Sequence, residues 1–126
     1  IVATTDEELD HICTYILSHQ NEFPDIGYHR NGIYLRFSHS AYSKGSALGE
    51  LSRLLGLTAE QCFAAGDNHN DISMLDRRYA AQIACPGNAL PPIKDIVRSR
   101  GGFVAQGIAS VGMIEALNHF FANPNR

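Results

Sequence analysis

The segment of this sequence best suited to chemistry is residues 66–71, which read Gly-Asp-Asn-His-Asn-Asp and place two carboxylates and two carboxamides within five positions. It directly follows the apolar run 62–65, a pattern typical of a strand buried on both faces of a parallel sheet. Ligands of open α/β sheets bind beyond the carboxyl ends of the strands, so Asp67 is expected at a binding edge. Carboxylate oxygens at that edge would suit a hard cation such as Mg²⁺.

Two other interpretations of this segment need consideration. In one, Asn70 or Asp71 only caps the helix that follows, while its neighbours serve turn geometry. Capping leaves the density of acids and asparagines unexplained, so we favour a functional site. In the other, the segment is a calcium-binding loop, which we reject because Ile72 would take the glycine position and Arg78 the position of the bidentate acid. His69 is expected to point outward.

Lys44 is the second candidate, at the start of a predicted helix in the sequence Ser-Lys-Gly-Ser. A cation is mildly unfavourable at the positive end of a helix dipole. A solvated surface lysine is the simple interpretation. A phosphate or a carboxylate cluster opposite the side chain would instead give the lysine a use as a point charge that holds anions together.

These candidates require an α/β framework to position them. Apolar positions recur at helical spacing up to Leu55, and Gly56 predicts a left-handed end to that helix. The expected elements that follow are a strand over 62–65, a short helix over 70–75, a strand over 81–84, a helix after 92, a strand over 103–105 and a helix over 110–121. Their alternation indicates α/β layers with a parallel sheet.

Residues 1 to about 40 have a different, α+β pattern. A capping box of Thr5 and Glu8 predicts the start of a helix, and two runs over 26–29 and 33–38 predict strands of an antiparallel hairpin around an Asn-Gly turn. In the second run Ile33, Leu35 and Phe37 are expected to share the buried face. The change of pattern predicts a boundary between residues 39 and 43.

Composition excludes several classes of protein. The chain has 126 residues, 44% of them hydrophobic, which is enough for a folded core. Its net charge of −3 disfavours nucleic acid and anionic membranes as partners. No apolar run is long enough for a membrane span and no signal-peptide pattern is present, so we expect a cytoplasmic location. The three cysteines form no CxxC pair and are expected to be buried thiols.

The order of the two motifs resembles the third and fourth motifs of the haloacid dehalogenase superfamily phosphatases. The stretch after residue 71 is similar to the type II capped branch, which contains the Cof-like and sucrose-phosphate-phosphatase-like enzymes. The ending, residues 112–120, is most similar to the sucrose-phosphate-phosphatase side. The resemblance covers nearly the whole chain. It implies that residues 1–40 are the C-terminal part of an α+β cap domain and that residues 41–126 are the distal half of a Rossmann-like α/β core.

The resemblance also implies roles for individual residues. Asp67 would bind Mg²⁺, and Asp71 would support the metal's water shell or the lysine. Lys44 would hold the catalytic nucleophile and the phosphoryl group, and Asn70 would help to orient phosphate. The implied reaction is hydrolysis of a small phosphomonoester, plausibly a sugar phosphate, through an aspartyl-phosphate intermediate.

The sequence departs from the family pattern at one point. No D-x-D occurs in it, so the nucleophile of the first motif is absent, as is the hydroxyl of the second. We therefore expect the N-terminal half of such an enzyme as a partner and no activity from these 126 residues alone. Two alternatives stay open: a non-catalytic module that binds metal or phosphate, and an interaction domain whose acidic loop only caps a helix. Four polar residues of the hairpin could face a substrate, although a solvated face is favoured: Tyr28, His29, Tyr34 and Arg36.

Overall fold

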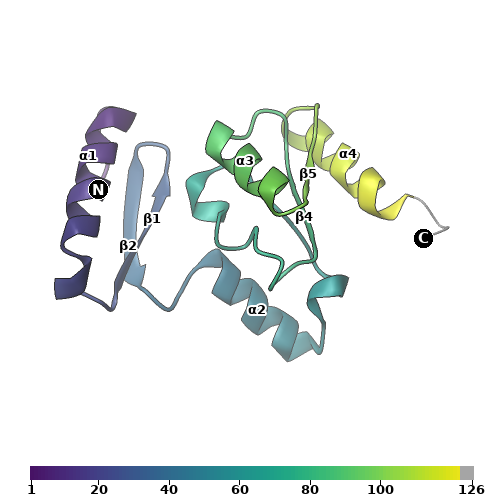
Figure 1. Ribbon diagram of the computed structural model, residues 1–126, viewed down its shortest axis with the longest axis horizontal. Helices are drawn as coiled ribbons and strands as arrows, with labels where there is room; N and C mark the ends of the chain where they lie inside the picture. Colours follow the sequence, from purple (N-terminus) through teal and green to yellow (C-terminus); the bar gives the residue numbers. More distant parts are fainter. Residues whose placement is uncertain (123–126) are drawn as a thin grey trace.

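The computed structural model of the protein describes residues 1–122 (Figure 1). The elements run in the order α1 (Asp6–Ser18), η1 (Gln20–Glu22), β1 (Ile26–Asn31), β2 (Tyr34–His39), α2 (Lys44–Leu55), η2 (Ala59–Gln61), β3 (Phe63–Ala65), η3 (His69–Asp71), β4 (Gln82–Cys85), α3 (Pro91–Ser99), β5 (Phe103–Val104) and α4 (Ala109–Phe121), where η denotes a short 3₁₀ turn. They form two groups: α1 with the β1–β2 hairpin, and the remaining helices with a sheet of β3, β4 and β5.

Helix α1 packs on one face of the antiparallel hairpin. It begins where predicted, because the Thr5 hydroxyl accepts a hydrogen bond from the backbone N–H of Glu8 at 3.1 Å. Leu9 and Cys13 of α1 pack in a small apolar cluster with Leu35 of β2. The first residues of the chain run beside β2 as well, a pairing that the sequence did not reveal.

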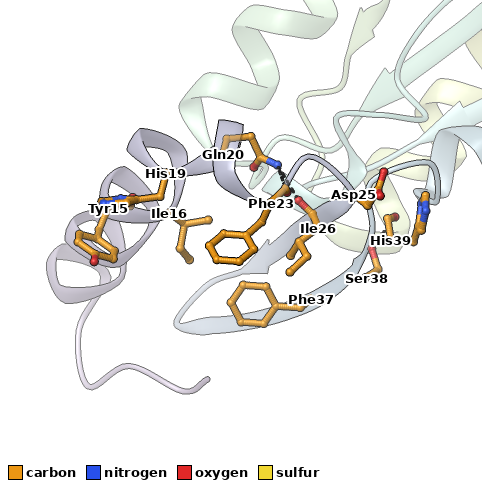
Figure 2. Close-up of a pocket in the computed structure, with 10 residues that line it drawn as sticks. All are labelled: Tyr15, Ile16, His19, Gln20, Phe23, Asp25, Ile26, Phe37, Ser38 and His39. Carbon is orange, nitrogen blue, oxygen red and sulfur yellow. Dashed lines mark hydrogen bonds between the residues drawn. The ribbon is translucent and has the colours of Figure 1, made fainter.

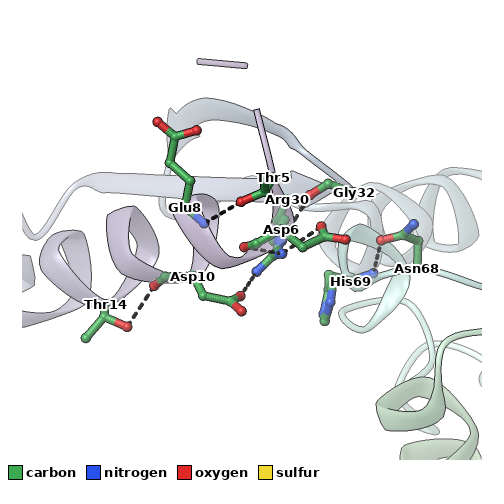
Figure 3. Close-up of polar contacts among 9 residues, drawn as sticks. All are labelled: Thr5, Asp6, Glu8, Asp10, Thr14, Arg30, Gly32, Asn68 and His69. Atoms are coloured by element: carbon green, nitrogen blue, oxygen red, sulfur yellow. Dashed lines mark hydrogen bonds and ion pairs between the residues drawn. The ribbon is translucent and has the colours of Figure 1, made fainter. Parts of the chain in front are cut away.

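An arginine ties β1 to α1. The Arg30 side chain is 13% exposed, and its guanidinium donates to the carboxylates of Asp6, at 3.0 Å, and Asp10 (Figure 3). Both carboxylates are more than half exposed, so the buried end of this contact is the guanidinium. The hairpin therefore keeps a fixed orientation relative to α1.

The hairpin differs from expectation in its turn and in one buried position. Asn31 pairs with Tyr34, so the turn lies at residues 32–33, one position later than predicted, with the glycine at a φ of +54°. Leu35 is 1% exposed, but Phe37 is 50% exposed. The prediction that Phe37 is buried is wrong because an open apolar groove of about 610 Å³ remains between this end of the hairpin and the C-terminal part of α1, where Tyr15 and Ile16 line the other side (Figure 2).

The second group confirms the α/β prediction. The three parallel strands have the order β3-β4-β5, and Figure 1 shows α3 and α4 on the two sides of β4 and β5. Helix α2 ends at Gly56, whose φ of +68° is the predicted left-handed cap. The largest fully buried side chains of this group are Leu75, Ile83, Cys85, Ile93 and Val97.

The short helix expected over 70–75 does not form. The chain makes the 3₁₀ turn η3 instead, with backbone hydrogen bonds from Asp71 to Asn68 at 3.0 Å and from Ile72 to His69 at 3.3 Å, followed by further turns. Asn68 caps this turn by accepting the backbone N–H of His69 at 2.8 Å. The capping interpretation assigns the cap to Asn70 or Asp71; in the structure the cap is Asn68, and Asp71 accepts the backbone N–H of Asn68.

Two composition arguments can be compared with the structure. Cys13, Cys62 and Cys85 are buried free thiols, as predicted. Within residues 1–122, no helix has both the length and the apolar character that a membrane span requires.

Candidate active site

Asp71 is the most completely bonded side chain of the acidic segment. Its carboxylate is buried, and one oxygen accepts a hydrogen bond from Lys44 Nζ at 2.5 Å. The other oxygen accepts the backbone N–H groups of Asp67 at 2.9 Å and Asn68 at 3.1 Å. Burial acts to raise the pKa of Asp71, but the hydrogen bonds from Lys44 and the two amides outweigh it, so the pKa lies below its ordinary value. Asp71 is an anion that holds both the lysine and the loop.

Gly66 makes this arrangement sterically feasible. A Cβ atom at position 66 would lie 2.3 Å from Asp71 Cβ and 2.7 Å from its carboxyl carbon. Any side chain there would push Asp71 away from the amides that it accepts. The glycine before the acidic residues is therefore required by close approach, and not by an unusual backbone angle.

Asp67 has the opposite character. Its backbone is held at both ends, because its N–H donates to Asp71 and its carbonyl accepts the N–H of Leu90 at 3.1 Å. Its exposed carboxylate makes no hydrogen bond or ion pair with any residue of the range 1–122. A free carboxylate thus stands on a fixed backbone just beyond the carboxyl end of β3.

Lys44 reaches Asp71 because of how α2 begins. The Ser43 side chain caps the helix, and the N–H of Gly45 donates to Ser73 Oγ at 3.1 Å. A Cβ at position 45 would lie 2.2 Å from the Ser73 carbonyl oxygen, so only glycine permits this contact. The Lys44 side chain is 48% exposed and projects from the unfavourable end of the helix dipole. Its ion pair with Asp71 offsets that cost.

The hairpin supplies a second wall to the same site. His29 and Arg36 are paired across β1 and β2 and lie on the hairpin face opposite to Leu35 and α1. Together with Lys44 and Asn70 they line a hollow of about 420 Å³. His29 Nε2 lies 2.8 Å from Ser38 Oγ, which fixes the imidazole. Figure 1 shows α1 on one side of the hairpin and the teal segment that contains η3 on the other.

His69 does not point outward as expected. Its side chain is partly buried and lines a hollow of about 440 Å³ between the hairpin and the acidic segment, together with Arg30 and Asn70. In Figure 3 the ring is drawn to the right of Asp10 and lower than Arg30. His69 is therefore a contact residue between the two groups of elements.

The structure places all four predicted site residues near one another, but it gives the two aspartates different surroundings. Lys44 and Asn70 line the hollow, and the buried Asp71 is bonded to Lys44. Asp67 is joined to Asp71 through its backbone N–H. Sequence reasoning missed the contribution of His29 and Arg36, for which a solvated face was favoured. The alternation of apolar and polar residues along β2 could have placed Arg36 on the face opposite to Leu35, but it does not show that this face lies toward the acidic segment.

Comparison with known proteins agrees with this geometry. A family profile described as haloacid dehalogenase-like hydrolase matches residues 1–107. The chain belongs to the haloacid dehalogenase-like hydrolases. A HMP-PP phosphatase of Serratia proteamaculans is 46% identical over 55 residues, which are 44% of this chain and 19% of that protein.

Two solved structures share the fold of this haloacid dehalogenase (HAD) chain. The sucrose-phosphatase of Synechocystis sp. PCC6803 superposes with a TM-score of 0.73 at 22% identity, over 86% of this chain and 46% of that one. A sugar phosphatase of HAD subclass IIB superposes with a TM-score of 0.67 at 25% identity, over 92% of this chain and 40% of that one. The profile match confirms the predicted family, and these two structures show that the fold is shared. The chain spans no more than about a third of the curated relatives it matches.

The donor set can be tested for a metal ion. Among the described residues no group of three or more His, Cys, Asp or Glu side chains converges as a complete metal site. Asp71 has both oxygens occupied, whereas Asp67 offers a free carboxylate on a fixed backbone. Mg²⁺ is commonly held by one or two carboxylates together with waters and substrate phosphates. Asp67 therefore fits Mg²⁺ as one ligand of a site that other groups would complete.

Proposed function

We propose that this chain is the cap end and distal core of a Mg²⁺-dependent phosphatase that hydrolyses a small phosphomonoester through an aspartyl-phosphate intermediate. The observation that carries the proposal is the pattern of hydrogen bonds in the acidic segment, residues 66–71. One carboxylate, Asp71, fixes a half-exposed lysine at the hollow, and the next carboxylate, Asp67, is left free at the end of β3.

Each proposed role follows from charge and position. Phosphoryl transfer requires mainly positioning and neutralisation of the phosphoryl oxygens. Lys44 would bind those oxygens and the nucleophilic carboxylate, and Asn70 would donate hydrogen bonds to phosphate. Asp67 would be a metal ligand, and bound Mg²⁺ would neutralise developing negative charge. Asp71 would act through Lys44 and the loop, because its oxygens already accept three hydrogen bonds.

The proposal also covers the substrate class, the assignment of residues to domains and the source of the catalytic nucleophile. Relatives named as a sugar phosphatase and a sucrose-phosphatase support a sugar phosphate as the substrate. We assign residues 1–40 to the cap and residues 41–126 to the core. The nucleophile would come from an N-terminal half of the enzyme that carries a D-x-D strand. A cytoplasmic location stays a prediction from the sequence.

The experiment compares two lengths of the protein. We expect no phosphate release from sugar phosphates by the 126-residue chain, and Mg²⁺-dependent release by a longer protein with an upstream D-x-D strand. In the longer protein, Asp67→Ala should lower kcat by about 100-fold or more. A Mg²⁺-dependent rate from the 126-residue chain that Asp67→Ala abolishes would contradict the proposal, as would an inactive longer protein.

A second candidate is a module that binds metal or phosphate without catalysis. The residues it needs, Lys44, Asn70 and the free carboxylate of Asp67, all lie within these 126 residues. A native gene whose upstream sequence lacks a D-x-D strand would select it over the enzyme.

A further inference from the structure

We propose that the hairpin face bearing His29 and Arg36 is a second anion subsite, so that the preferred ligand is a phosphate ester carrying another anionic group, such as a sugar bisphosphate or a phosphorylated sugar acid. The inference rests on the proposed function, because Lys44 would hold the phosphate that is hydrolysed. It adds the chemistry of the other end of the ligand.

Arg36 differs from the other arginines of the protein. Those at positions 30, 53, 78 and 98 contact carboxylates, and those at 77 and 100 donate to backbone carbonyls. Over residues 1–122, Arg36 is the one arginine whose guanidinium has neither kind of partner. Its five donors are free to bind an anion in a bidentate manner.

Within residues 1–122, the hollows that Arg36 lines contain basic side chains and no carboxylate, although the chain as a whole is acidic. The hollow of about 420 Å³ is lined by Arg36, Lys44, His29 and Asn70 among others, and none of its described lining residues is Asp or Glu. An adjoining hollow of about 300 Å³ adds Asn31 and Tyr34, again without a carboxylate. With 13 acidic against 10 basic residues in the chain, a hollow without acids concentrates positive potential where a ligand would enter.

The hairpin holds this face in place. Arg36 is registered opposite His29, whose Nε2 lies 2.8 Å from Ser38 Oγ and 3.1 Å from the Tyr42 carbonyl oxygen. On the reverse face, Arg30 anchors the hairpin to α1. The Arg36 side chain therefore extends from a fixed backbone into the hollow that Lys44 also lines, with one cation for each end of a doubly anionic ligand.

The test measures binding by the 126-residue chain at constant ionic strength, by calorimetry or amide NMR, with a hexose monophosphate and a hexose bisphosphate as probes. We expect the wild-type chain to bind the bisphosphate about tenfold more tightly, because one charge-assisted bidentate contact is added. In Arg36→Gln the preference should fall to about twofold, the statistical advantage of two phosphates over one. The matched control, Arg98→Gln on α3, changes net charge equally and should keep the tenfold preference.

Three outcomes would overturn the subsite: equal affinity for the two esters, a preference that survives Arg36→Gln, or binding of neither ester. Far-UV circular dichroism of Arg36→Gln confirms that the variant folds. The result is separable from that of the proposed function. If a longer protein hydrolyses sugar monophosphates but Arg36→Gln keeps the preference for the bisphosphate, the subsite is wrong and the proposed phosphatase function stands.

Discussion

The two walls of the site are built in different ways. The loop wall, made of residues 66–71 with Lys44, contains a buried carboxylate that accepts three hydrogen bonds. The hairpin wall, made of His29 and Arg36, presents a guanidinium without a partner among the described residues. In the loop wall, Asp71 fixes Lys44 and the backbone that carries Asp67. In the hairpin wall, Arg36 holds no other residue of the range 1–122 in place.

This difference separates fold from ligand choice. A change in the loop wall removes bonds on which the local structure depends, so it should lower stability and function together. A change in the hairpin wall should alter which ligand binds and leave the fold intact. Residues that determine ligand specificity are commonly found on loops and surfaces that do not contribute to stability.

The largest expected effect is that of Asp71→Ala. The substitution leaves Lys44 and two backbone amides without their acceptor, and we expect a loss of about 2–3 kcal/mol, less than for a fully buried pair because the lysine is half exposed. Urea unfolding measures it. Asp95→Ala on α3 removes an exposed ion pair with Arg98 and should cost less than about 0.5 kcal/mol. Equal losses in the two variants would contradict the comparison.

Gly66→Ala should follow, with a loss of about 1–3 kcal/mol, because its Cβ would overlap Asp71. The control is Gly49→Ala inside α2. That Cβ would meet only the ring of Tyr79, and alanine is favoured over glycine in a helix by about 1 kcal/mol. The same unfolding measurement applies, and a smaller loss for Gly66→Ala than for Gly49→Ala would show that the loop does not need close approach at this position.

Acid should weaken the loop wall in a predictable direction. Because the pKa of Asp71 is lower in the folded than in the unfolded protein, its contribution to stability is present above the ordinary carboxyl pKa of about 3.9 and is lost as pH falls through the folded value. Unfolding free energies at pH 5 to 3 should therefore fall less steeply in Asp71→Asn than in the wild type. Parallel slopes would show that Asp71 is not the anion described.

The smallest effect is expected in the hairpin wall. Arg36→Gln should change the free energy of unfolding by less than about 0.5 kcal/mol, because no protein contact is lost. Arg30→Gln, on the opposite face of the same hairpin, removes a buried guanidinium from two carboxylates and should cost more than about 1 kcal/mol. If Arg36→Gln lowered the free energy of unfolding as much as Arg30→Gln, both faces of the hairpin would contribute to stability, which would contradict the comparison.

Local signals in the sequence predicted most of the elements. Thr5 and Gly56 mark the start of α1 and the end of α2 because capping depends on neighbouring residues. The helix expected over 70–75 is replaced by the 3₁₀ turn η3, which begins with a capping box of Asn68 and Asp71 but continues into further turns and not into an α-helix. Phe37 was misplaced because its exposure depends on how closely the C-terminal part of α1 packs against the hairpin, where a groove remains open.

The site was predictable in composition but not in assembly. The residue types at 67, 70 and 71 indicate anion and metal chemistry by themselves. The contact of Lys44 with Asp71 joins positions 27 residues apart, and only the resemblance to a family implied it. Alternation along β2 places Arg36 on the face opposite to Leu35. No local sequence pattern shows that this face lies toward the acidic segment.

The central claim is the division of labour between the two aspartates, and a Mg²⁺ titration of a longer protein that carries the upstream D-x-D strand, followed by amide NMR of residues 66–69, tests it most directly. The account predicts saturable shifts in the amides of residues 66–69, their loss in Asp67→Asn and their retention in Asp95→Asn, with a rise in Tm on adding Mg²⁺ only where the shifts occur. Shifts that persist unchanged in Asp67→Asn, or a longer wild-type protein that does not respond to Mg²⁺, would contradict it.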